Sequence, residues 1–250
     1  MKIGAQFYTI RDFCKTKEDL YESLKKVADI GYTTVQLSGV CQYDPAEMRA
    51  ELDRLGLKCV LTHIPTARIE NETLQVARDH TILGCDHIGL GWFDFGCEGG
   101  ENNVPKFIET YTEPCKIFKG EGKYFMYHNH AAEFKKVGNK TVMELLAEGM
   151  PKELMGFTLD TYWVQVGGAD PADYIERLSG RVPVIHLKDC AFGQKMAVVG
   201  EGNINFDRVF KMAEAAGTEY MMVEQDDCNG EDPFDCLRRS YEYLKACGFN

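Results

Sequence analysis

The chain alternates strand-like and helix-like segments from one end to the other without a break. The strand-like segments are short and rich in apolar residues, as expected of parallel strands that are buried on both faces. They cover residues 2–10, 33–37, 58–64, 87–92, 124–130, 155–164, 182–187 and 219–225. The helix-like segments that follow them cover residues 17–30, 45–55, 72–83, 104–119, 141–148, 170–178, 206–216 and 232–246. Eight such alternations in 250 residues predict one α/β domain, residues 1–250, folded as a closed (β/α)8 TIM barrel.

Motifs of other α/β folds and of exported proteins are missing from the sequence. No GxGxxG follows the first strand and no GxxxxGK[ST] occurs, which argues against dinucleotide-binding and P-loop folds. No segment approaches the roughly 20 apolar residues of a membrane span, and the first residues do not resemble a signal peptide. The 10 cysteines lack paired or zinc-finger spacing, which favours buried thiols in a reducing compartment. We therefore expect a cytoplasmic protein without a membrane partner.

The charge balance bears on the choice of partner. The chain has 28 Lys and Arg residues against 39 Asp and Glu residues, a net charge of −11. This balance repels a phosphate backbone, so we expect no nucleic-acid partner. A local lysine or a metal ion can still attract a small anionic substrate.

Four of the strand-like segments end in residues that bind metals or transfer protons. The segments are YFMYHNH, MGFTLD, VPVIHLKD and YMMVEQD, and the residues are His128, Asp160, His186 and Glu224. The carboxyl ends of the strands of a parallel barrel converge on one face, so these side chains should meet. Imidazole and carboxylate groups that meet at one point suit a divalent cation. The sequence therefore predicts a metal site at the mouth of the barrel.

Three of these residues also have a structural interpretation. Asp160 could cap a helix, although the next expected helix begins near a better cap, Asp170. His186 could be a core histidine, but Lys188 lies two residues later on the same side of the strand and could reach a substrate oxygen. Glu224 could be a solvated carboxylate at a strand end. That interpretation explains less well why Glu224 stands at the same place on its strand as the other three residues.

The fifth strand-like segment and the turn after it are dense in potential ligands. His128 and His130 share one face of the strand, and Glu133 follows in the turn. His63 closes the third strand-like segment and could line the same mouth. The alternative is a cluster of histidines at the surface.

Other residues give weaker indications. His87 begins its strand and is expected to be structural, whereas His80 lies in a helix and is expected to be solvated. Four further side chains near strand ends either line the mouth or pack the barrel: Tyr8, Gln36, Trp92 and Trp163. The segment GEGNINF, residues 200–206, either presents backbone N–H groups to an anion or forms an ordinary turn.

Several motifs together resemble one known family. They are GAQFYTIRD, YHNHAAEF, FTLDTYWV, GRVPVIHLKD, GEGNINFDRVF and MMVEQD. They are similar to the sugar phosphate isomerase/epimerase group of the xylose isomerase-like TIM barrels, and YHNHxxEF is similar to an inosose dehydratase-like sub-branch. The resemblance covers almost the whole chain. It implies a divalent metal ion (Mn, Co, Mg or Zn) held by four residues at the ends of strands five to eight.

The resemblance accounts for three of the four ligands. Asp160, His186 and Glu224 match the family positions, but His128 stands where the epimerases have a glutamate that also serves as an acid–base. The fourth ligand is then either His128 or Glu133, which follows five residues later. We expect Glu133, because its carboxylate restores the family's usual charge; His128 would then contact the substrate or transfer a proton.

The resulting expectation is a metal-dependent isomerase or epimerase that acts through an enediolate on a keto-sugar, free or phosphorylated. Glu224 would move the proton, with Glu133 or His128 opposite it. The residues expected to bind the substrate are His130, Lys188, His63, Tyr8 and Trp92. A small-molecule sugar or sugar phosphate is the expected partner, and the sequence allows a homo-oligomer.

Three other functions remain open at this point. A lyase or dehydratase acting on a keto-inositol, a keto-sugar or a 3-keto-glycoside would share the same first half-reaction. An endonuclease IV-like DNA-repair enzyme would need additional metal ligands and a basic face. A chain with 6 histidines and a net charge of −11 argues against both. A barrel that binds a sugar without catalysis would lack a bindable metal ion.

Overall fold

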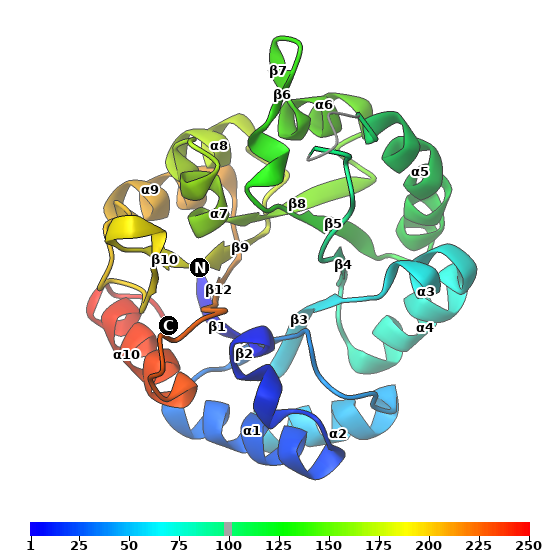
Figure 1. Cartoon of the computed structure of the whole chain (residues 1–250). Coiled ribbons are helices and arrows are strands. Elements are labelled where there is room, and N and C mark those ends of the chain that lie inside the picture. Colours follow the sequence, from blue (N-terminus) through cyan, green and yellow to red (C-terminus); the bar gives the residue numbers. More distant parts are fainter. Residues whose placement is uncertain (98–101) are drawn as a thin grey trace.

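The computed structural model describes residues 1–97 and 102–250, and it is a closed barrel of eight parallel strands surrounded by helices (Figure 1). The strands follow the order β1-β12-β9-β8-β5-β4-β3-β2 around the barrel. Their bounds are β1 (Lys2–Gln6), β2 (Thr34–Leu37), β3 (Lys58–His63), β4 (His87–Leu90), β5 (Tyr124–His128), β8 (Met155–Asp160), β9 (Val184–Leu187) and β12 (Tyr220–Val223). This arrangement confirms the predicted TIM barrel.

The helices form the outer ring. They are α1 (Lys17–Ile30), α2 (Pro45–Leu55), α3 (Thr66–Asn71), α4 (Thr73–Leu83), α5 (Val104–Gly120), α6 (Val142–Gly149), α7 (Thr161–Val166), α8 (Pro171–Arg177), α9 (Phe206–Ala216) and α10 (Pro233–Ala246). Many start at a side chain that accepts a hydrogen bond from the first helical turn, which satisfies an otherwise unpaired N–H group. These caps are Thr16, Asp44, Thr141, Asp160, Asp170, Asn205 and Asp232.

Short elements decorate the carboxyl-terminal face. Two small hairpins pair β6 (Lys136–Val137) with β7 (Lys140–Thr141) and β10 (Asp189–Cys190) with β11 (Met196–Ala197). Three 3-10 turns cover Phe7–Phe13, Ala132–Phe134 and Phe192–Gln194. In the part of the chain that the structure describes, no helix has the length and apolar character that crossing a membrane requires.

The strands are shorter than the predicted segments, and two of those segments change to helical turns. The first strand ends at Gln6, where the chain enters a 3-10 turn capped by the Gln6 side chain. The segment predicted as a strand over 155–164 changes to the helix α7 after Asp160. The apolar residues of TYWV do not separate a strand from a short helix, and the cap at Asp160 decides for the helix.

The inside of the barrel is apolar at its amino-terminal end and polar at its carboxyl-terminal end. A cluster of six side chains fills the apolar end: Val60, Leu61, Met126, Val184, Tyr220 and Met222. Alternate residues of a strand face the same side, so the next inward positions along three of these strands are His128, His186 and Glu224. The packed apolar layer therefore forms the floor on which the polar residues lie. The larger apolar cluster lies between the strands and the helices.

The cysteines and two histidines have structural positions. All 10 cysteines are free thiols, and most of them are buried. His87 donates from Nδ1 to the carbonyl oxygen of Val60, away from the mouth of the barrel. The expectation that His80 is solvated is wrong, because only 2% of its surface is exposed. Its Nδ1 donates to the Val76 carbonyl at 2.7 Å, and its Nε2 accepts from the Thr62 hydroxyl at 2.7 Å.

The burial of His80 predicts a pH-dependent contribution to stability. Burial lowers the pKa of His80 from 6.5 to about 4, so the folded state keeps the ring neutral. As the pH falls from 6.5 towards 4, the unfolded chain binds a proton that the folded chain does not. Stability is therefore lost by about 1.4 kcal/mol per pH unit from this group. Urea denaturation measures the free energy of unfolding between pH 7 and 5. This free energy should fall less steeply with decreasing pH in His80→Gln than in the parent, by this amount. Equal slopes would contradict the lowered pKa of His80.

Candidate metal centre

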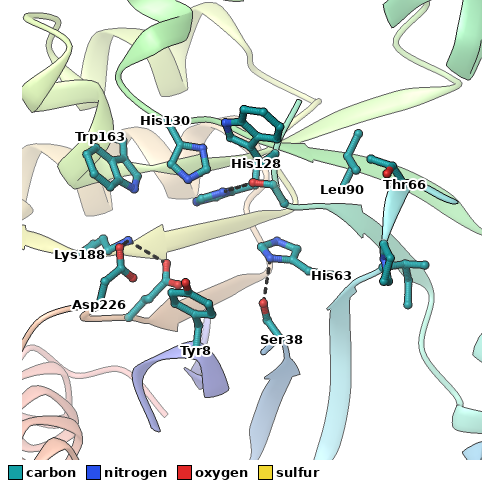
Figure 2. A pocket seen from close by; sticks show the side chains of 15 residues that line it. Tyr8, Ser38, His63, Thr66, Leu90, His128, His130, Trp163, Lys188 and Asp226 are labelled. Atoms are coloured by element: carbon teal, nitrogen blue, oxygen red, sulfur yellow. Dashed lines mark hydrogen bonds and ion pairs between the residues drawn. The ribbon is translucent and has the colours of Figure 1, made fainter. Parts of the chain in front are cut away.

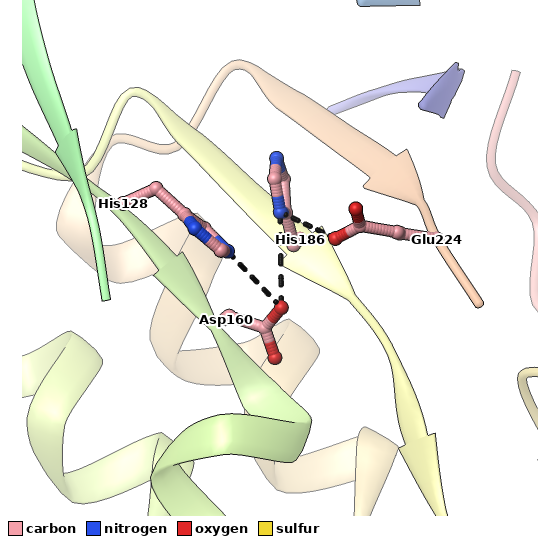
Figure 3. Close-up of side chains that lie close together, drawn as sticks. All are labelled: His128, Asp160, His186 and Glu224. Carbon is pink, nitrogen blue, oxygen red and sulfur yellow. Dashed lines mark hydrogen bonds and ion pairs between the residues drawn. The ribbon is translucent and has the colours of Figure 1, made fainter. Parts of the chain in front are cut away.

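Four buried side chains meet above the apolar floor of the barrel (Figure 3). They are His128 at the end of β5, Asp160 at the end of β8, His186 within β9 and Glu224 directly after β12. One ligand atom from each lies within 4.8 Å of the other three. His186 Nδ1 is 2.8 Å from Glu224 Oε2 and 3.8 Å from Asp160 Oδ2, and His128 Nε2 is 3.3 Å from the same Asp160 oxygen. The strand ends thus bring together four groups that could hold a metal ion.

Asp160 combines the two roles that the sequence left open. Its Oδ1 accepts a hydrogen bond from the Trp163 N–H at 2.9 Å and so caps α7. Its Oδ2 faces His128 and His186. The cap fixes the carboxylate plane, which holds the second oxygen toward the cluster.

A chain of hydrogen bonds orients the ring of His186. His186 Nε2 donates to Gln36 Oε1 at 2.7 Å, and the Gln36 amide nitrogen donates to His63 Nε2 at 3.0 Å. His63 Nδ1 then carries the proton and donates to the Ser38 hydroxyl at 3.0 Å. Gly89 leaves room for the His63 ring, because a Cβ atom at position 89 would lie 2.8 Å from His63 Cδ2.

The donor set fits a divalent cation. With Nε2 bonded to Gln36, the Nδ1 atom of His186 points toward the two carboxylates and lies 2.8 Å from Glu224 Oε2. A metal-bound histidine characteristically donates its other ring N–H to an acceptor in this way. Two imidazoles and two carboxylates are ligands that Zn, Mn and Co accept.

Lys188 balances the negative charge of the cluster. Its ammonium lies 2.8 Å from Asp226, 3.2 Å from Glu224 and 3.3 Å from Asp160, and 1% of the lysine is exposed. Burial by itself would lower the pKa of Lys188, but the three carboxylates raise it above its ordinary value. Lys188 is therefore a permanent cation beside the candidate metal ligands.

The ionisation of the other groups follows from the same charges. Burial lowers the pKa of His186, but Glu224 and Asp160 outweigh it and raise the value to about 9. Burial raises the pKa of Glu224, but Lys188 and His186 outweigh it and hold the value below the ordinary range. Burial and the charge of Glu224 raise the pKa of Asp226 to about 6. In the metal-free protein the cluster is a network of ion pairs, and a cation would replace the proton of His186.

Glu133 lies outside this cluster. It is buried in the 3-10 turn after β5, where it accepts a hydrogen bond from the Tyr127 hydroxyl and another, at 2.9 Å, from the His130 N–H. Both oxygens are used to hold the turn that carries His130.

A cavity of about 580 Å³ lies above the cluster (Figure 2). All five residues expected to bind substrate line it: Tyr8, His63, Trp92, His130 and Lys188. His128, Trp163 and Glu224 line it as well, whereas Glu133 does not.

Ser38 and Asp226 are two polar lining residues to which the sequence assigned no role. Both follow a deeper residue of the site by two positions: Ser38 follows Gln36, and Asp226 follows Glu224. His130 and Lys188 have the same relation to His128 and His186. The two-residue repeat of a strand was the signal that could have identified them.

The glycine-rich loop 200–206 does bind an anion, and the anion is the chain's own Asp189. The backbone N–H groups of Gly200, Gly202 and Ile204 donate to the Asp189 carboxylate at 3.0, 2.8 and 3.2 Å. The N–H of Cys190 donates to it at 2.7 Å. The carboxylate thereby fastens the loop to the end of β9.

Comparison with known proteins agrees with this geometry. Residues 24–247 match the model of the xylose isomerase-like TIM barrel family. The chain belongs to this family. It is similar to an inosose dehydratase of Geobacillus kaustophilus, with 22% identity over 264 aligned positions that cover 88% of this chain and 85% of the relative.

Solved structures of this barrel family show the same fold. A sugar phosphate isomerase/epimerase from Parabacteroides distasonis superposes with a TM-score of 0.83 at 22% identity, covering 98% of this chain and 93% of the other. An L-ribulose 3-epimerase superposes with a TM-score of 0.75 at 14% identity, covering 98% and 94%. Relatives of this barrel thus include both epimerases and a dehydratase.

The contact between Gly202 and Asp189 predicts a steric effect. A Cβ atom at Gly202 would overlap the Asp189 carboxylate, so Gly202→Ala should lower the free energy of unfolding by about 1–3 kcal/mol. Gly120 at the end of α5 is a matched control, because a Cβ atom there meets nothing within 4 Å. Urea denaturation of both variants measures the difference. Equal stability of Gly202→Ala and Gly120→Ala would contradict the packing described for the loop.

Proposed function

We propose that this barrel is a metal-dependent isomerase or epimerase that acts on a keto-sugar through an enediolate. The observation that carries the proposal is the convergence of His128, Asp160, His186 and Glu224 beneath a cavity lined by polar and aromatic side chains. The similarity to epimerases supports the reaction class. A divalent ion (Mn, Co, Mg or Zn) held there would polarise the substrate carbonyl and make the neighbouring C–H proton easier to remove.

His128 is the fourth ligand in this proposal, and Glu133 is not. The Nε2 atom of His128 already faces Asp160, whereas both oxygens of Glu133 are bonded to Tyr127 and to the His130 N–H. With His128 and His186 neutral, Asp160 and Glu224 supply the charge that neutralises a divalent ion. Glu133 then affects the metal site only indirectly, by holding the turn that carries His130.

Glu224 removes the proton beside the carbonyl and returns it. It lines the cavity, and the ammonium of Lys188, 3.2 Å away, keeps it ionised. His130 lies across the cavity, two residues after the end of β5, and β9 and β8 stand between β12 and β5 around the barrel. Burial lowers the pKa of His130 to about 3, so its ring is neutral and can accept a hydrogen bond from a substrate hydroxyl. Trp163 packs against that ring with centroids 5.3 Å apart and fixes its position.

Separate substitutions of the two candidate ligands test the metal site. His128→Gln should weaken Mn²⁺ binding by at least about tenfold, because it removes a donor from the cluster. Glu133→Gln keeps an acceptor for Tyr127 and should leave Mn²⁺ affinity within about threefold of the parent, since it acts only through the turn. Titration calorimetry of the metal-free proteins measures both, with circular dichroism to check folding. Loss of Mn²⁺ binding in Glu133→Gln alone would reject His128 as the ligand.

Substitution of Glu224 tests the proton transfer. Glu224→Gln should slow substrate C–H exchange by about 10²–10⁴-fold at saturating Mn²⁺, because the amide cannot accept the proton. Proton NMR of a keto-sugar panel in D₂O follows the exchange. Glu214→Gln, an exposed change on α9, is the control and should exchange at the parent rate. Full exchange by Glu224→Gln would remove this residue from the acid–base role.

A lyase is the second candidate, and the similarity to an inosose dehydratase favours it. The same enediolate can expel a β-hydroxyl group as water instead of taking back its proton. Asp226, whose pKa is raised to about 6 by burial and by Glu224, could protonate that leaving group. The NMR experiment separates the two outcomes, because an isomerase yields a deuterated sugar isomer and a lyase yields a dehydrated product.

A further inference from the structure

The cavity above the candidate metal centre offers almost no free positive charge. Among the described residues that line it, Lys188 is the only lysine or arginine. Residues 98–101, which the structure does not describe, include no lysine or arginine in their sequence. Arg11 lies behind the lining, where its guanidinium stacks on the Tyr8 ring and donates to the backbone carbonyl oxygens of Tyr8 and Asp226. Within the lining, attraction for an anionic substrate has to come from Lys188, from backbone N–H groups or from the metal ion.

The ammonium of Lys188 is already paired with carboxylates of the chain. Three carboxylates lie within 3.3 Å of its ammonium, and the nearest, Asp226, is at 2.8 Å. A phosphate could reach the ammonium only by displacing one of them. That would leave Asp160, Glu224 or the partly buried Asp226 without its cationic partner, which is costly inside a protein.

The backbone donors of the loop after the seventh strand are used as well. TIM barrels that bind phosphate often do so with the loops after the seventh and eighth strands. In this barrel the loop after the seventh strand, β9, directs three N–H groups at Asp189, which is 1% exposed. The chain's own carboxylate fills the anion site.

The remaining charges balance without the substrate. A divalent ion and Lys188 together neutralise Asp160, Glu224 and Asp226. Of the three histidines that line the cavity, His63 spends both ring nitrogens on Gln36 and Ser38. A phosphate group would bring uncompensated negative charge into this enclosed site, whereas sugar hydroxyls would bring none.

We propose that the substrate of this site is an uncharged keto-sugar and that the site discriminates against the phosphorylated form. This inference rests on the proposed function and narrows its substrate class. Trp163 and Trp92 supply apolar surface for the sugar ring, and the carboxylate of Asp226 and the ring of His130 supply acceptors for its hydroxyls.

Matched sugar pairs test the proposal. Binding to the Mg²⁺-loaded protein is measured by ligand-observed NMR for D-fructose and D-fructose 6-phosphate, D-ribulose and D-ribulose 5-phosphate, and D-xylulose and D-xylulose 5-phosphate. In each pair that binds, the free sugar should bind at least about tenfold more tightly, the order expected for one uncompensated charge. Tighter or equal binding of the phosphorylated member overturns the proposal, and so does failure of every free sugar to bind.

A substitution that frees Lys188 sharpens the test. Asp226→Asn removes the closest carboxylate, so it should raise the affinity for the phosphorylated member by about tenfold relative to the parent. Asp29→Asn removes the same charge from an exposed site on α1 and should change neither affinity. Unchanged discrimination in Asp226→Asn overturns the explanation by Lys188.

The outcome also separates this inference from the proposed function. Proton exchange with a phosphorylated sugar alone would reject the inference and keep the isomerase or lyase. Preferential binding of free sugars without exchange would keep the inference and reject the proposed chemistry.

Discussion

Lys188 binds the carboxylates of Asp160, Glu224 and Asp226 inside the barrel, and the arrangement of the site depends on this balance of buried charge. A carboxylate in an apolar interior is stable only if it is paired with a cation or fully hydrogen-bonded. One lysine serves three carboxylates here, so the cluster retains the capacity to bind a second cation. The same pairing leaves Lys188 without charge to offer an anionic substrate.

The two-residue repeat of the strands divides the inside of the barrel into layers. Met126, Val184 and Met222 form the apolar floor, and the next inward residues are the candidate metal ligands. The layer above consists of His130, Lys188 and Asp226, which face the cavity (Figure 2). The paired strands are offset in register, with Met222 opposite His186 and Thr158 opposite Val184. The tilt of the strands in a closed barrel compensates for this offset and brings residues far apart in the sequence to one height.

Supporting contacts maintain the orientation of the site residues. Gln36 and His63 hold the ring of His186, the cap of α7 holds Asp160, and Glu133 holds the turn that carries His130. The first contact joins three strands and depends on closure of the barrel, whereas the contacts of Asp160 and Glu133 are local. The cost of leaving a buried polar group unpaired makes such supports as important as the ligands.

The sequence by itself determined the fold and the strand-end residues, because the strand and helix periods and the apolar runs are local properties of the chain. It therefore identified Asp160, His186, Glu224 and five of the residues that line the cavity: Tyr8, His63, Trp92, His130 and Lys188. Only the tertiary structure supports the proposal of His128 over Glu133, because the course of the turn after β5 sets where Glu133 points. It also decided that His80 is buried and that Asp189 occupies the glycine-rich loop. Both depend on contacts between segments that meet only when the helices pack on the closed barrel.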